Sequence, residues 1–292
     1  MKTELHRLVL IEGDDDEELI DWLEVPENRK RIDEGDVMGW TPLHWCCARE
    51  MVENAQILLE HGANPNAASE EGWTPAHDAA RSGNLQMLQL LKKHGAKLNS
   101  ATENGTTPMH YIVKFGHAKT LKWLATLDEE GKEDVDRPNN LGWTPLHFSA
   151  RFGRLDAAKE LIALGANVFH KDKMEKKPRQ TGEEAGKQIK AGVLKLEKTK
   201  FGAEVTLNDY AQIDELIVKA EAEQARRCRE LALSAMQNAD LAVDANDLED
   251  AVGHLRVAAT QYRLAEMEEE AAKADAQAQK HLDAMKVTDK VG

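Results

Sequence analysis

The stretch GWTPLH, residues 142–147, decides the fold because its Thr-Pro-x-His core occurs four times in the chain. The four copies lie at 41–44, 74–77, 107–110 and 144–147, which gives spacings of 33, 33 and 37 residues. A unit of about 33 residues is too small to bury its own apolar face, so successive copies must stack and share one core. The sequence therefore predicts a solenoid.

Each copy begins a unit with the same predicted order of elements: a hairpin turn, a short helix, a tight turn and a second helix. In the unit at 70–102, Pro75 falls in the first turn of a helix, where proline is tolerated. Gly83 then ends that helix, and LQMLQLL at 85–91 places apolar residues at helical spacing. Gly95 supplies the left-handed residue that ends the second helix.

Three segments make the chain resemble the ankyrin-repeat family: GWTPLH at 142–147, GWTPAH at 72–77 and LLEHGANPNA at 58–67. The resemblance extends over about residues 1–172. It implies four ankyrin repeats in residues 37–172, which we number 1 to 4, and it implies that the protein recognises other proteins. Family membership alone names no ligand, because fold does not determine function.

The first unit, residues 1–36, is predicted to be a degenerate capping repeat. Thr3, Leu5 and His6 stand there at positions of the TPLH motif. A terminal repeat needs a polar outer face because nothing stacks on it, and the acid run at 12–18 supplies one.

Residues 173–205 are predicted to form a divergent capping repeat and a basic linker. Pro178 and Gly186 each fall 33 residues after their counterparts in repeat 4. We expect the second helix of this unit around 191–200. In repeat 4 itself, the segment 128–138 replaces the usual connection and is predicted to be an extended loop.

Residues 206–286 are predicted to form a long hairpin of two antiparallel helices, followed by a tail at 287–292. Apolar and alanine residues, Leu231 among them, recur there at helical spacing on both sides of a turn at 246–247. The segment 247–258 resembles the second helix of a tetratricopeptide unit, but the residues before it lack that family's aromatic and glycine positions. The predicted fold class is therefore all-α: an ankyrin-repeat solenoid of helix-turn-helix units with short hairpin loops, plus a long C-terminal helical hairpin.

Composition favours an intracellular, cytoplasmic protein. The formal net charge of -14 opposes general nucleic-acid binding. Only three cysteines occur, Cys46, Cys47 and Cys228, which does not suggest a disulfide framework. No 18 apolar residues run together and the N-terminus does not match a secretion signal, so we expect neither membrane spanning nor export.

No catalytic pattern is present in the sequence. The segment TGEEAGKQ at 181–188 lacks the spacing of a phosphate-binding loop, and no GxSxG or HExxH motif occurs. The motif histidines fall in successive repeats about 10 Å apart, too far for one metal. We expect each imidazole to hydrogen-bond across its hairpin and helix start. These histidines are His44, His77, His110 and His147. We therefore predict a protein that is not an enzyme and that has no cofactor and no metal.

The predicted partner-binding residues lie at the hairpins and on the exposed edge of each first helix. They are aromatic or cationic, the residue types that most often carry interface energy. They are Trp40, Trp73, Arg81, Lys114, Phe115, Trp143, Arg151 and Phe152. The alternative is that the tryptophans only cover neighbouring hairpins and pack.

These observations predict a scaffold or adaptor. Its repeats would bind a protein with acidic and apolar surface, the acidic tails of tubulin being one candidate, and its C-terminal helices would bind a second partner or a second copy. Within that class, a structural subunit of a cytoskeletal or ciliary assembly would suit repeats followed by a helical arm. The alternative is a regulatory protein that masks a transcription factor or an enzyme, with nuclear traffic directed by the basic stretch at 171–179.

Overall fold

The computed structural model describes residues 3–10, 16–127, 135–191, 205–244 and 247–288. The described residues form helices joined by turns, with no strand among them, which confirms the all-α class. The chain divides into two compact units, which we call the N-terminal unit (1–216) and the C-terminal unit (217–292).

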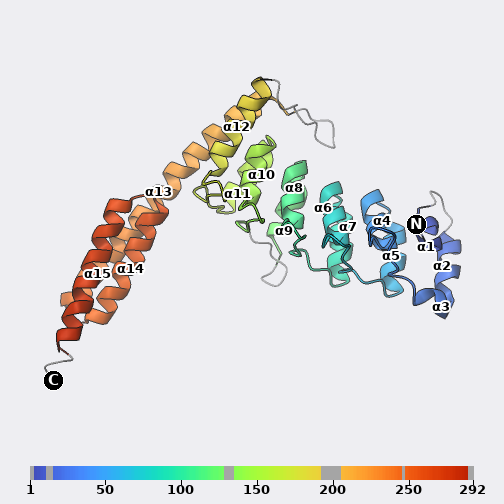
Figure 1. Ribbon diagram of the computed structural model, residues 1–292, viewed down its shortest axis with the longest axis horizontal. Helices are drawn as coiled ribbons and strands as arrows, with labels where there is room; N and C mark the ends of the chain where they lie inside the picture. The colour runs from blue at the N-terminus through green and yellow to red at the C-terminus, as the bar shows by residue number, and fades with distance from the viewer. Residues whose placement is uncertain (1–2, 11–15, 128–134, 192–204, 245–246, 289–292) are drawn as a thin grey trace. The chain divides into compact units, whose positions relative to one another are not determined.

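The N-terminal unit consists of short helices that alternate between two rows (Figure 1). Its helices are α1 (Glu4–Leu8), α2 (Asp16–Glu24), α3 (Pro26–Arg29), α4 (Pro42–Arg49), α5 (Val52–Glu60), α6 (Pro75–Ser82), α7 (Leu85–Lys93), α8 (Pro108–Phe115), α9 (Ala118–Ala125), α10 (Pro145–Arg151), α11 (Leu155–Ala163) and α12 (Pro178–Lys190). The first helices α1, α4, α6, α8, α10 and α12 pack side by side in that order. The predicted solenoid is therefore confirmed.

One equivalent position forms the spine of the core. It is occupied by leucine in every repeat, and each of these side chains is 0 % exposed: Leu58, Leu91, Leu124 and Leu161. Burying such a side chain stabilises the fold by about 1.5–3 kcal/mol. Because each leucine is covered by the neighbouring repeats, no single repeat could gain this stabilisation alone.

The degenerate first unit keeps the hydrogen bonds of the motif. The backbone N–H of Thr3 donates to Nδ1 of His6 at 3.1 Å, and Thr3 caps α1. Nε2 of His6 lies 2.7 Å from the carbonyl oxygen of Trp40 in repeat 1. Proline is thus dispensable at this position, where Glu4 begins the helix.

At the other end of the stack, α12 begins at Pro178 as expected but continues through Gly186 to Lys190. The close approach of α12 to α10 explains one glycine, because a Cβ at Gly182 would lie 3.2 Å from that of Ala150. The second helix expected around 191–200 lies outside the described residues, apart from its first residue. The same holds for most of the predicted loop at 128–138.

Residues 205–216 belong to the N-terminal unit and pack on repeat 4. The hydroxyl of Tyr210 donates to the backbone oxygen of Arg151 at 3.2 Å. Val205 is buried, and a Cβ built at Gly153 would lie only 2.4 Å from its Cγ1. This segment therefore covers the end of repeat 4 and adds a chain-distant contact to the stack.

Substitution of Gly153 tests how much the packing of residues 205–216 on repeat 4 contributes to the stability of the N-terminal unit. We expect Gly153→Ala to destabilise the N-terminal unit by about 2–4 kcal/mol, since alanine at positive φ costs about 1–2 kcal/mol and overpacking costs about 1–3 kcal/mol more. Gly165→Ala is the matched control, because Gly165 also has positive φ but meets nothing within 4 Å. Urea unfolding gives both free energies. Equal losses of unfolding free energy in the two variants would show that Val205 and Tyr210 do not pack closely against Gly153.

The C-terminal region contains three helices instead of the predicted two: α13 (Leu207–Asp244), α14 (Leu248–Leu264) and α15 (Glu268–Thr288). The prediction of a hairpin of two helices is wrong at residues 265–267, where the helix breaks between α14 and α15. Glu266 adopts φ 58, and the N–H of Met267 donates to the carbonyl of Tyr262 at 2.8 Å, which ends α14. No glycine, proline or asparagine marks this break. The three glutamates that open α15 are favoured there by the helix dipole.

The core of the C-terminal unit is made mainly of alanine. Its larger cluster joins all three helices through Ala232, Ala235, Ala258, Ala259, Tyr262, Ala271 and Ala274. Leu231, expected on the buried stripe, is 57 % exposed, and Ala232 takes its place. Small side chains at the contact let helix axes approach closely, so the buried stripe follows alanine and not the larger leucine.

Candidate partner-binding surface

Every hairpin turn of the N-terminal unit is closed by a short polar side chain at its first position. That side chain accepts a hydrogen bond from the backbone N–H four residues later, as Asn139 Oδ1 does from Trp143 at 3.0 Å. The equivalent residues are Asp36, Ser69, Thr102, Asn139 and Asp172. Such turns are typical of Asx and Ser/Thr residues. These five residues recur at the repeat spacing, so the turns could have been predicted from the sequence.

Neighbouring hairpins are tied together by backbone hydrogen bonds. The N–H of Glu103 donates to the oxygen of Glu71 at 2.9 Å, and that of Asn140 donates to the oxygen of Asn104 at 2.9 Å. The N–H of Lys173 likewise donates to Leu141 at 3.0 Å. These bonds join the last four hairpins into a ridge beside the row of first helices, and side chains of both elements line one surface.

The motif histidines hold hairpin, helix and next repeat together, as predicted. In repeat 3, Nδ1 of His110 accepts from the N–H of Thr107 at 3.2 Å, and Nε2 lies 3.0 Å from the carbonyl of Trp143. An acceptor at Nδ1 and a donor at Nε2 define a neutral imidazole. His44, His77 and His147 make the same contacts. Burial lowers the pKa of all four imidazoles to about 4.

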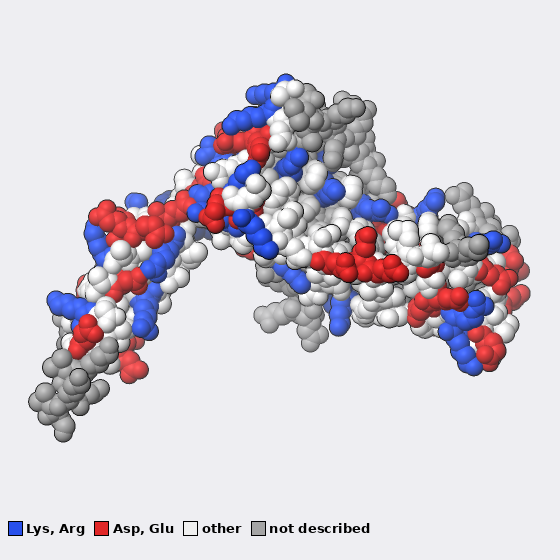
Figure 2. All heavy atoms as spheres, viewed as in Figure 1, with Lys and Arg blue, Asp and Glu red and all other residues white. Residues whose placement is uncertain are grey.

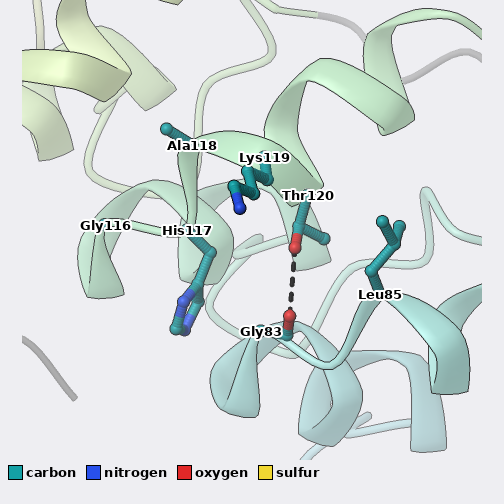
Figure 3. A pocket seen from close by; sticks show the side chains of 7 residues that line it. All are labelled: Gly83, Leu85, Gly116, His117, Ala118, Lys119 and Thr120. Carbon is teal, nitrogen blue, oxygen red and sulfur yellow. Dashed lines mark hydrogen bonds between the residues drawn. The ribbon is translucent and has the colours of Figure 1, made fainter. Parts of the chain in front are cut away.

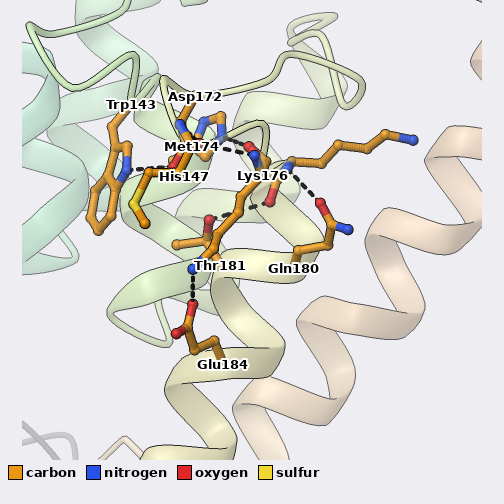
Figure 4. Close-up of polar contacts among 9 residues, drawn as sticks. Trp143, His147, Asp172, Met174, Lys176, Gln180, Thr181 and Glu184 are labelled. Atoms are coloured by element: carbon orange, nitrogen blue, oxygen red, sulfur yellow. Dashed lines mark hydrogen bonds and ion pairs between the residues drawn. The ribbon is translucent and has the colours of Figure 1, made fainter.

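The three predicted tryptophans are half-buried and pack against other aromatic rings. Trp73 meets Tyr111 of the next repeat edge-on, with ring centroids 4.6 Å apart. Trp143 contacts Phe148 at 5.7 Å, and its Nε1 donates to Asp172 at 2.9 Å (Figure 4). The tryptophans therefore pack in part, and each keeps part of its surface exposed.

The three predicted cations occupy one equivalent position and lie over aromatic rings. Arg81 is 5.8 Å from the ring of Trp73. Nζ of Lys114 lies 5.4 Å from the ring centroid of Phe115 and 5.1 Å from that of Phe152. The guanidinium carbon of Arg151 lies 5.9 Å from the same Phe152 centroid. The structure thus sorts the predicted residues into one group around Trp73 and another around Phe152. Contacts of this kind are worth about 0.5–1 kcal/mol at exposed sites.

The row of cations ends with a charge reversal in the capping unit. Glu184 stands where repeat 4 has Arg151, and Lys176 stands where repeat 4 has Trp143. Nζ of Lys176 lies 2.5 Å from the carboxylate of Glu184 (Figure 4). The capping unit therefore has an ion pair at the two positions that hold an aromatic and a cationic residue in repeat 4. Figure 2 shows basic side chains spaced along the first helices and acidic ones gathered in a band beside them.

Asp78 lies beside the group around Trp73 and is not among the predicted partner-binding residues. It takes a position filled by aromatic rings in other repeats, and it is 0 % exposed. Arg81 donates to its Oδ1 at 3.4 Å. Its Oδ2 and the nearby Nε1 of Trp73 are both buried, and neither makes a hydrogen bond of normal geometry. Burial, opposed by the charge of Arg81, raises the pKa of this carboxyl to about 7.

Two hollows open on this surface and a third opens elsewhere. One of about 290 Å³ lies between the first two hairpins, and one of about 310 Å³ adjoins Trp143 and Glu184. The third, of about 390 Å³, lies between helix-connecting turns (Figure 3). There His117 and Thr120 hydrogen-bond the carbonyls of Arg81 and Gly83, so these polar groups serve the packing of adjacent repeats.

Within the described parts of the chain, no group of three His, Cys, Asp or Glu residues is placed to hold a metal ion. None of the helices there has the length and apolar character needed to cross a bilayer.

Comparison with known protein families gives a match over the repeats. A family model described as ankyrin repeats (3 copies) matches residues 5–102 and 94–172, which together make up more than half of the chain. No curated protein matches the chain. The matched residues include all four copies of the motif and all eight predicted partner-binding residues, and they end before α12.

Proposed function

Because the chain belongs to the ankyrin-repeat family, its repeats are a protein-interaction module, and we propose that they bind a partner along the surface of hairpins and first helices. One observation carries this proposal. Lys114 lies over the half-buried rings of Phe115 and Phe152, next to Arg151, and each of these side chains keeps part of its surface exposed. Aromatic rings and arginine are the usual centres of binding energy in protein interfaces.

The chemistry of this group indicates the partner. Cations held over rings favour carboxylates, and the rings themselves favour apolar side chains, so the partner presents acidic and apolar groups to repeats 3 and 4. Acidic tails such as those of tubulin fit this requirement. A structural role in a cytoskeletal or ciliary assembly in the cytoplasm is the finer proposal, and it rests on the combination of repeats and helices.

A second contact through the C-terminal unit would make the protein an adaptor. Leu231, Leu233 and Leu241 of α13 are 57 %, 51 % and 66 % exposed. Exposed leucines on one helix support docking of a second partner or a second copy of the chain.

The alternative of a regulator with nuclear traffic gains less support. Its basic stretch at 171–179 forms the last hairpin and the start of α12, and three of its cations are held in ion pairs. Lys171 pairs with Glu175, Lys176 with Glu184, and Arg179 with Asp214. A stretch engaged in this way is less accessible as an extended recognition signal.

The binding proposal predicts a charge-dependent loss of partners. We expect the double variant Lys114→Glu and Arg151→Glu to weaken binding about 30-fold, from about 1 kcal/mol lost at each position. Quantitative affinity capture with the full chain, followed by titration of each purified partner, measures the loss. Lys93→Glu with Lys97→Glu is the matched control, because these exposed lysines lie in and after α7. Partners retained equally by both variants would reject the proposed surface.

A further inference from the structure

The hollow of about 290 Å³ between the first two hairpins differs in chemistry from the rest of the repeat surface. Its volume is at the small end for ligand sites and suits one side chain better than a cofactor. Apolar groups and carboxylates line it together. The lining residues that matter here are Val37, Met38, Trp40, Glu70, Glu71 and Trp73.

The apolar part of the hollow is open to a partner. Val37 and Met38, at the tip of the first hairpin, are 74 % and 58 % exposed. The half-buried indoles of Trp40 and Trp73 stand on consecutive hairpins at equivalent positions. Aliphatic groups and aromatic walls of this kind cover the methylene stem of a long side chain and stabilise a cation placed over a ring.

The charge of the hollow is negative. The carboxylates of Glu70 and Glu71 make no ion pair or hydrogen bond with the residues that the structure describes. Arg81 also lines the hollow, but it already donates to Asp78 and lies over Trp73. The hollow therefore contains two carboxylates without partners and one cation, Arg81, that already has partners. The resulting negative charge disfavours an anionic ligand and favours a cationic one.

We propose that this hollow binds an arginine side chain of the segment held by the repeat surface, an inference that rests on the proposed function. Arginine fits better than lysine, because its planar guanidinium stacks on an indole and forms two parallel hydrogen bonds with a carboxylate. The guanidinium lies at Trp40 and Trp73 and donates to Glu70 or Glu71.

The position of the hollow sets the spacing within the partner. The hollow lies between repeats 1 and 2, whereas the group around Phe152 joins repeats 3 and 4, two repeats further along the stack. Helix axes about 10 Å apart place the two sites roughly 20 Å apart. An extended chain spans that distance in about six residues. The partner segment therefore carries its arginine about six residues from its acidic group.

The test uses N-acetyl-L-arginine amide as the probe and the full chain labelled with ¹⁵N. We expect the indole N–H signals of Trp40 and Trp73 to move and saturate, while that of Trp143 stays in place. The citrulline analogue has the same shape without the charge and is expected not to saturate. Equal movement with citrulline, or movement of all three indoles alike, overturns the proposal.

Variants show whether the carboxylates hold the probe. We expect Glu70→Gln with Glu71→Gln to weaken binding at least threefold. Glu53→Gln with Glu103→Gln changes the net charge equally at exposed acids outside the hollow, and is expected to leave binding unchanged. If both double variants weaken binding of the probe equally, the effect comes from the long-range charge of the protein, and the proposed site is overturned.

The outcomes separate this inference from the proposed function. If Lys114→Glu with Arg151→Glu abolishes partner capture but the arginine probe does not bind, the hollow is rejected and the proposed surface stands. If the probe binds at Trp40 and Trp73 while those charge reversals leave capture unchanged, the hollow is supported and the acidic-partner surface is rejected.

Discussion

We expect the free energy of unfolding of the N-terminal unit to fall by several kcal/mol as the pH is lowered from 7 to 4.5. Burial holds the pKa of His44, His77, His110 and His147 at about 4 in the folded chain, against an ordinary value of 6.5. Between pH 6.5 and pH 4 these histidines are protonated in the unfolded chain but neutral in the folded chain. Their contribution to stability is therefore fully present above pH 6.5 and is lost as the pH falls towards 4. At about 1.4 kcal/mol per pKa unit, each imidazole accounts for about 3 kcal/mol.

Asp78 acts in the opposite direction. Its folded pKa of about 7 lies above the ordinary value of 3.8, so the folded state holds a proton that the unfolded state releases, and acidification favours folding at this one group. The stability lost through the four histidines exceeds the stability gained through the one carboxyl. The summed loss from the histidines, on the order of 10 kcal/mol, is comparable with the whole stability of a domain.

Tryptophan fluorescence isolates this effect, because all six tryptophans lie before residue 144, in the N-terminal unit. Urea titrations at pH 7, 6, 5 and 4.5 give the free energies. The same series in 0.5 M salt is the control, since desolvation of a buried imidazole is screened much less than surface charge. A stability that stays within 1 kcal/mol across this range would show that the imidazoles are not neutral and buried.

The second large effect is expected from removal of one of these imidazoles. His110→Ala should destabilise the N-terminal unit by about 3 kcal/mol or more. It leaves the N–H and hydroxyl of Thr107 and the carbonyl of Trp143 without their partner, and each buried group left unsatisfied costs about 1–3 kcal/mol. His94→Ala is the control, because His94 ends α7 at the surface edge and is not fully buried. Similar losses in the two variants, measured by urea unfolding, would contradict the bridging role.

The TPxH motif shows why much of the fold could be predicted. Threonine at an N-cap, proline at the first helical position and histidine three residues after the cap act within one turn of helix, so their roles follow from local geometry. The spacing of the copies then required stacking. Leu58 and its equivalents could be assigned to a core for the same reason, because an apolar position that recurs in each repeat must face its neighbours.

The candidate site was predictable only in part. Trp73, Arg81 and Arg151 were identified by residue type and repeat position. Their pairing was not, since Arg81 lies over Trp73 whereas Arg151 lies over Phe152. Glu70 and Glu71 gave no signal as hairpin acids, because the hollow they line exists only between two stacked hairpins.

By itself, the sequence determined the repeat, its helices and the bonding of its histidines, because those features depend on residues close in the chain and on a regular period. Only the tertiary structure decided that Asp78 is buried beside Trp73, that Glu266 ends α14, and that Trp40 and Glu70 share a hollow. Burial, helix ends without a local breaker, and cavities depend on which surfaces meet. That is set by packing between elements, which no local pattern records.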